Sequence, residues 1–169
     1  MFATIANGLR ITNWLNWIVA ALLMAFFALL LADPEGFRDT IFYGFDAETG
    51  ARAEIQNSLF GVLALVPPLA VAVHFILTRL AALVRDTAAG AAFTLRNAQR
   101  LSTIGWALLA INVADLFYGW LSVRASEATV EYFGWSLSLT GWIAVPMLFV
   151  LAHVFREGTA MREDLEGTV

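Results

Sequence analysis

Four long runs of apolar residues constrain this chain more than any other feature of its sequence. They cover about residues 14–31, 59–82, 101–123 and 135–154, and a helix of about 20 mostly apolar residues crosses the hydrocarbon core of a bilayer. The chain is 60% hydrophobic and only 14% charged, so a water-soluble fold would expose large apolar patches. We therefore predict an all-α integral membrane protein, a single domain over residues 1–169, with four helices in an up-down-up-down bundle.

The placement of arginine predicts the orientation of these spans. With the N-terminus inside, the inner segments hold Arg10, Arg79, Arg85, Arg96, Arg100, Arg156 and Arg162, whereas the outer loops hold only Arg38, Arg52 and Arg124. This excess of positive charge in short inner segments is typical of cytoplasmic loops. We expect both termini to lie in the cytoplasm, and we expect a multi-pass protein of a bacterial inner membrane.

The first outer loop, about residues 32–58, mixes acidic and aromatic residues. Its acids are Asp33, Glu35, Asp39, Asp46, Glu48 and Glu54, and its large apolar residues are Phe37, Ile41, Phe42, Tyr43 and Phe45. This mixture is compatible with a small cap resting on the membrane surface, and equally with a partly ordered loop.

One acid, Asp115, lies within the predicted third span, where an ionisable group is costly to insert. Asn112 lies one turn earlier on the same helix face. Pro67 and Pro68 in the second span have no N–H groups, which frees the carbonyls four residues earlier. We expect Asp115 to point into the bundle and to donate to a freed carbonyl or to Asn112, mostly protonated because burial disfavours the carboxylate. This group is then either a proton or ligand site or a polar clamp between helices.

Two further features of the spans bear on helix packing. Pro146 lies mid-span in the fourth run, where it either lines a cavity or kinks a helix whose neighbours satisfy the freed carbonyl. Small residues on the first run would let another helix approach closely, within the chain or in a homodimer; they are Ala21, Ala25, Ala28 and Ala32.

The inner loop and the C-terminal tail, residues 156–169, carry the candidate partner-binding residues. Thr94 is a natural N-cap for a helix that begins near Leu95. Such a helix puts Arg96 and Arg100 on one face, where they contact lipid phosphates or pair with the acidic tail. The predicted docking residues are Arg96, Asn97, Arg100, Arg156, Glu157, Arg162, Glu163 and Asp164.

Two stretches resemble a known family. The inner stretch matches its pattern at Gly90, Phe93, Thr94, Asn97, Arg100, Leu101, Ile104 and Gly105, and the tail matches at Val154, Phe155, Arg156, Glu157, Gly158, Arg162, Glu163, Thr168 and Val169. Both stretches are similar to the domain-of-unknown-function 2975 family of bacterial four-span membrane proteins. The resemblance implies no activity, but its members are often encoded beside a small helix-turn-helix regulator, which implies a membrane partner for a transcription factor.

The residues favour a non-enzymatic protein. The chain has no cysteine, its ten basic residues are all arginine, and no catalytic set, metal-ligand cluster or phosphate loop is recognisable. We therefore predict no cofactor, no metal site and, with a net charge of −4, no direct contact with nucleic acid. The leading hypothesis is a regulatory or scaffolding protein whose loop and tail dock a soluble partner. The alternatives are a small transporter or lipophilic-ligand or proton sensor near Asp115, and an accessory subunit of a larger membrane complex.

Overall fold

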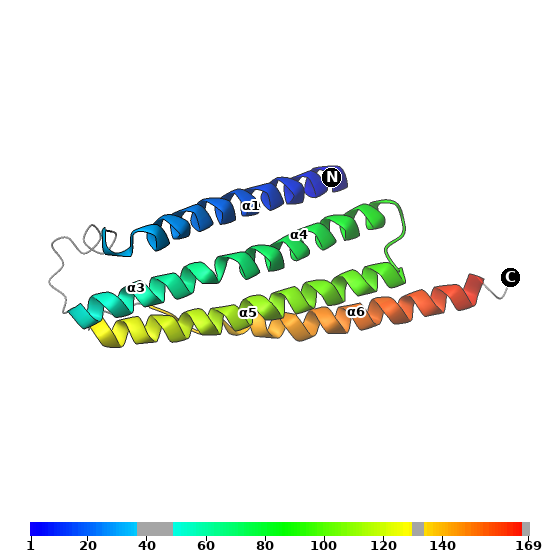
Figure 1. Cartoon of the computed structure of the whole chain (residues 1–169). Coiled ribbons are helices and arrows are strands. Elements are labelled where there is room, and N and C mark those ends of the chain that lie inside the picture. The colour runs from blue at the N-terminus through cyan, green and yellow to red at the C-terminus, as the bar shows by residue number, and fades with distance from the viewer. Residues whose placement is uncertain (37–48, 130–133, 167–169) are drawn as a thin grey trace. The chain divides into compact units, whose positions relative to one another are not determined.

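Helices make up nearly all of the described chain. The computed structural model describes residues 1–36, 49–129 and 134–166. The helices, traced in Figure 1, are α1 (Phe2–Ala32), α3 (Thr49–Ala64), α4 (Val66–Ala88), α5 (Leu95–Thr129) and α6 (Leu139–Glu166). No residue in these described ranges lies in a strand, so the predicted all-α class is confirmed.

The apolar side chains of these helices face mainly outward. Four helical segments are long and apolar enough to cross a membrane, with mean hydropathies of 2.4, 2.3, 1.4 and 1.6 over their most apolar windows, yet only 11, 17, 33 and 11% of those windows is buried. Trp14, Leu29 and Ile143 are 71, 70 and 61% exposed. Because water would disfavour such surfaces, the arrangement fits a multi-pass membrane protein whose outer solvent is lipid.

The helices differ from the apolar runs in where they begin and end. The candidate spans are Phe2–Ala32, Arg52–Ala88, Leu95–Glu127 and Leu139–Met161, so the first three exceed the predicted runs at both ends. Polar residues such as Asn7 and Asn13 continue a helix without adding to its hydropathy, so hydropathy marks only the part that lipid surrounds. The fourth helix begins later than predicted: Trp135 precedes it and packs on Gly119 instead.

The predicted outer cap is only partly described. Its residues 37–48 lie outside the described ranges, and the chain is already helical at Thr49 rather than at about residue 59. The side chain of Gln56 on α3 donates to the carbonyl of Pro34 at 3.3 Å. The second half of the expected loop is therefore a helical extension of the second span.

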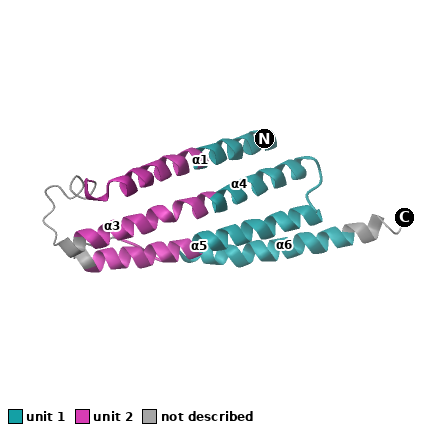
Figure 2. Cartoon of the chain, in the orientation of Figure 1, with its two compact units in different colours: residues 1–16, 71–112, 138–169 teal, residues 17–70, 113–137 magenta. Residues whose placement is uncertain are grey.

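The chain divides into two compact units, which Figure 2 shows in different colours. Unit 1 comprises Met1–Asn16, Val71–Asn112 and Ser138–Val169, and contains parts of α1, α4, α5 and α6. In this unit α4 and α5 are joined by a short turn, and α5 pairs with α6 so that Gly105 meets Phe149 whereas Asn112 meets Gly141. The residue number on α6 decreases as the residue number on α5 increases. The two helices are therefore antiparallel, as the up-down order requires.

Unit 2 comprises Trp17–Ala70 and Val113–Leu137. Phe27 of α1 and Phe60 of α3 form an edge-to-face ring pair with centroids 5.7 Å apart, an arrangement that adds to simple apolar contact. Glu54 of α3 forms an ion pair with Arg124 of α5 at 2.9 Å. The hydroxyl of Ser58 lies 3.5 Å from the carbonyl oxygen of Leu121, so polar as well as apolar contacts join these helices.

Gly105 lets α5 and α6 approach each other closely in unit 1. A methyl group built on Gly105 would lie 3.2 Å from the ring of Phe149 on α6, and that ring forms an edge-to-face pair with Trp106 at 5.3 Å. By contrast, a methyl group on Gly8 of α1 would meet nothing within 4 Å. The α5–α6 contact therefore depends on the absence of a side chain at position 105.

We expect Gly105→Leu to lower the free energy of unfolding by about 1–3 kcal/mol, because overpacking forces neighbours apart. Thermal unfolding of the purified protein in detergent checks this, with Gly8→Leu as the matched control that should leave the midpoint unchanged. Equal midpoints for Gly105→Leu and the unmodified chain would show that α5 and α6 do not pack as described.

Candidate functional site

The connection between α4 and α5 begins with a helix-ending turn at Gly90. Its N–H donates to the carbonyl of Thr87 at 3.0 Å, and the N–H of Ala91 donates to the carbonyl of Asp86 at 2.9 Å. This pair of bonds is the Schellman motif, which needs a left-handed residue after the last helical turn. Gly90 supplies it with a φ of 77°, a conformation in which a side chain would be strained.

The side chain of Asn97 binds the backbone of the connection between α4 and α5. It is completely buried, and its side-chain nitrogen donates to the carbonyls of Ala91 and Ala92 at 3.0 and 2.9 Å. Its own N–H lies 3.2 Å from the hydroxyl of Thr94, which confirms the predicted N-cap. Because partly buried carbonyls without donors are costly, this amide helps to hold the loop in place.

An ion pair between the two helices completes the network. Arg100 of α5 lies 2.5 Å from the carboxylate of Asp86 on α4 and donates to the side-chain oxygen of Asn97 at 2.6 Å. The two charged side chains are 15 and 31% exposed, respectively, so water screens the pair only partly. The predicted partners of Arg100 were lipid phosphate or the acidic tail; the structure pairs it with Asp86 instead.

The same loop contacts helix α6. The ring of Phe93 lies 4.9 Å from that of Phe155, centroid to centroid, and a methyl group on Gly158 would come within 3.0 Å of the Phe93 ring. Phe93 nevertheless remains 48% exposed. The loop therefore packs on the second half of α6. We call the exposed residues next to this contact the loop–α6 surface: Phe93, Arg96, Arg156 and Glu157.

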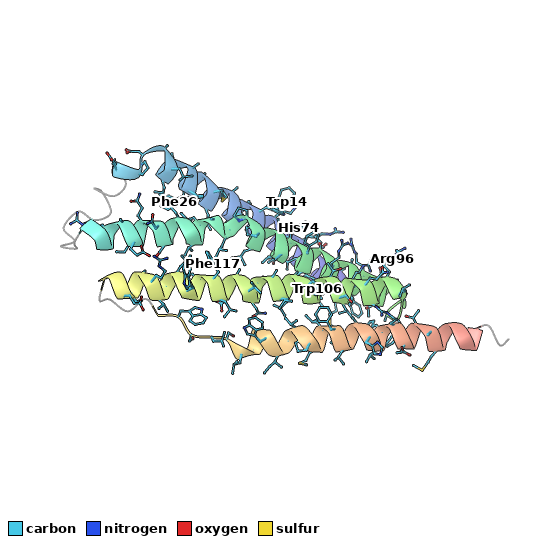
Figure 3. All side chains as sticks on the ribbon, turned by 60° about the horizontal axis from the view of Figure 1, so that its bottom comes forward. Trp14, Phe26, His74, Arg96, Trp106 and Phe117 are labelled. Atoms are coloured by element: carbon cyan, nitrogen blue, oxygen red, sulfur yellow. The ribbon has the colours of Figure 1, made fainter. Side chains whose placement is uncertain are left out.

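Arg96 is an exposed charged residue of this surface, and Figure 3 labels it near the start of α5. It is exposed and lines two clefts. One cleft, of about 230 Å³, also contains Arg79, Gln99, Arg100 and Thr103. The other is bounded by Asp86, Ala91 and Thr94. Arg96 therefore stays available to an outside partner, whereas Asn97 and Arg100 are engaged within the loop.

The predicted intramembrane site is not assembled as expected. Asn112 is buried, its amide donates to the carbonyl of Leu108 at 2.9 Å, and its side chain packs against Gly141 of α6. Asp115 is half-buried and has no hydrogen bond or ion pair to any described residue. The expected bond to the carbonyls of Leu63 or Ala64 is therefore absent, and a proton or ligand role for Asp115 stays a prediction.

The prolines act on the backbone. Pro67 and Pro68 are the second and third residues of α4, after a break at Leu65 that separates α3 from α4. At a helix start their missing N–H groups have no intrahelical acceptor to lose. Pro146 is exposed within α6, which continues on both sides.

A small apolar cavity in unit 2 bears on the ligand-sensor alternative. It has a volume of about 170 Å³, lies between α3 and α5, and includes the polar side chains of Ser58, Ser122 and Tyr118. Asp115 is not among its lining residues. The cavity therefore does not connect that alternative with the acid that suggested it.

Several contacts of the candidate site could not be predicted from the sequence. Phe93 and Gly158 match the family pattern, but nothing in their spacing indicates that they touch each other across 65 residues. The sequence also did not indicate that Asp86, which follows Arg85, would pair with Arg100. The side chains of Arg162, Glu163 and Asp164 lie outside the described ones, so their predicted role is not placed.

A comparison with family models identifies the family of this chain. The model described as protein of unknown function (DUF2975) matches residues 2–169. The chain belongs to this family. No curated protein and no solved structure matches it. The two stretches that carried the resemblance to DUF2975 meet in unit 1, because Phe93 of the first packs on Phe155 and Gly158 of the second.

We expect Asn97→Ala to destabilise the protein by about 2–3 kcal/mol, because two loop carbonyls lose their donor and Arg100 loses an acceptor. Thermal unfolding in detergent measures the loss, and Gln99→Ala, an exposed residue on the same turn, serves as control. A midpoint for Asn97→Ala equal to that of the control would contradict the account of the loop.

Proposed function

We propose that this protein is a non-enzymatic regulatory or scaffolding protein of a bacterial inner membrane, with both termini in the cytoplasm. In this proposal the loop–α6 surface and the tail dock a soluble partner, such as a small helix-turn-helix regulator. The observation that supports it most is the packing of Phe93 on Phe155 and Gly158, which brings the loop into contact with the start of the tail.

A fixed loop is a better docking surface than a flexible one. The bonds of Asn97, the turn at Gly90 and the Asp86–Arg100 pair hold the loop before any partner arrives. A surface that is already ordered loses little conformational entropy on binding. The half-exposed ring of Phe93 can then act as an apolar anchor with charged residues around it.

The charge of the tail points to a basic partner. Glu157 is exposed on α6, and Glu163, Asp164 and Glu166 follow it in the sequence. A helix-turn-helix regulator carries a basic recognition helix that binds DNA. A tail with four carboxylates would attract that helix and compete with DNA, chiefly at low ionic strength.

The test is a binding assay between the purified full-length protein in detergent and a small helix-turn-helix regulator of the kind often encoded beside members of the family. We expect binding to the full-length chain and none to a chain that ends at Phe155. We expect Glu157→Lys to weaken binding by about tenfold, since reversal replaces one attraction by a repulsion.

The matched control is Glu127→Lys, an exposed glutamate near the end of α5 in unit 2, which should leave binding unchanged. Equal unfolding midpoints for the variants ensure that a loss of binding is not a loss of fold. No binding to the full-length chain, or equal binding by Glu157→Lys and Glu127→Lys, would overturn the proposal.

A further inference from the structure

A cleft with two arginines lies in unit 1 between the start of α1 and the end of α4. Its volume is about 170 Å³, and Arg10, Asn13 and Trp14 line it from α1, opposite Leu77, Thr78 and Arg85 of α4. No acidic residue lines it. The chain therefore brings two positive charges together from different helices without a carboxylate between them.

Neither arginine is neutralised from outside the cleft. Arg10 and Arg85 are exposed, and neither forms an ion pair with a described residue. Asp86, the acid next to Arg85, is already engaged by Arg100 at 2.5 Å. Two guanidinium groups in this arrangement favour a ligand with negatively charged oxygens, and a phosphate group suits their paired donors.

One polar contact joins the two helices beside the cleft. The Nδ1 of His74 on α4 lies 2.9 Å from the side-chain oxygen of Asn13, and the hydroxyl of Thr78 donates to the carbonyl of His74 at 2.7 Å. The first of these bonds joins α1 to α4, and the second lies within α4. The contact between Asn13 and His74 therefore holds α1 and α4 together beside the cleft. Figure 3 labels His74 and also Trp14, which lines the cleft.

The polarity of the cleft changes along its length. Arg10 precedes the first apolar run and Arg85 follows the second, whereas Trp14 and Leu77 lie one to two turns further into the spans. Arginine at the end of a span and tryptophan just inside it are the residues found at lipid headgroups and at the membrane interface. The ligand must therefore have a charged end and an apolar remainder.

We propose that this cleft binds one anionic phospholipid, with the phosphate on Arg10 and Arg85 and an acyl chain along Trp14 and Leu77. The neighbouring cleft of Arg79, Arg96 and Arg100 is less suited to a lipid. Its lining has no apolar or aromatic side chain, and Asp86 neutralises one of its arginines.

The test measures lipid binding to the purified full-length protein by native mass spectrometry. Phosphatidylglycerol should bind in preference to phosphatidylcholine, which has the same acyl chains but no net charge. The double variant Arg10→Gln/Arg85→Gln should bind phosphatidylglycerol about tenfold more weakly, because each arginine contributes to headgroup attraction. Arg10→Lys/Arg85→Lys, which keeps the charge, should retain most of the binding.

The matched control is Arg79→Gln/Arg96→Gln, which removes the same charge from the neighbouring cleft and should bind like the unmodified chain. Unfolding midpoints without added lipid show whether each variant is folded. Equal binding of the two lipids, or an equal loss in both glutamine pairs, would overturn the proposal. Inorganic phosphate should not displace the lipid at equal concentration; displacement would assign the cleft to free phosphate instead.

Discussion

Lipid as the outer solvent is the constraint from which the rest of the structure follows. A bilayer offers no hydrogen-bond partners to the backbone, so each span must be helical, and the apolar side chains that would destabilise a soluble protein become the outer surface. Trp14 and Ile143 are exposed for this reason. Polar side chains inside the helix contacts then carry structural tasks. Asn112 packs where α5 and α6 meet at Gly141, and Ser58 bridges α3 and α5.

Several hydrogen bonds and an ion pair hold the connection between α4 and α5, where the described chain leaves the helical pattern. Here Gly90 ends one helix, Thr94 begins the next, and Asn97 satisfies the carbonyls between them. The contact of Phe93 with α6 extends this order to the C-terminal helix. Unit 1 therefore holds both the surface proposed for a soluble partner and the arginine cleft proposed for a lipid. A partner and an anionic membrane would act on the same unit, which is a physical basis for coupling them.

The sequence predicted those features that depend on composition over many residues. The four apolar runs predicted the helices that could span a membrane, and Thr94 predicted the start of α5. It could not show where a side chain finds its partner in space. Asn97 was expected to face a soluble protein, yet it is buried in its own loop, because its bonds run backward to carbonyls that no residue pattern marks. Asp115 was expected to bond to freed carbonyls, but the register that would bring them together is set by packing between helices.

Labelling of single cysteines in intact cells tests the central claim most directly, since the chain has no cysteine of its own. Glu157→Cys on α6 and Glu127→Cys near the end of α5 place one thiol at each predicted face of the membrane. A membrane-impermeant maleimide should label position 127 in intact cells and position 157 only after the membrane is opened. Labelling of position 157 from outside intact cells, or of both positions alike, would contradict four spans in lipid with the loop and the tail on the inner side.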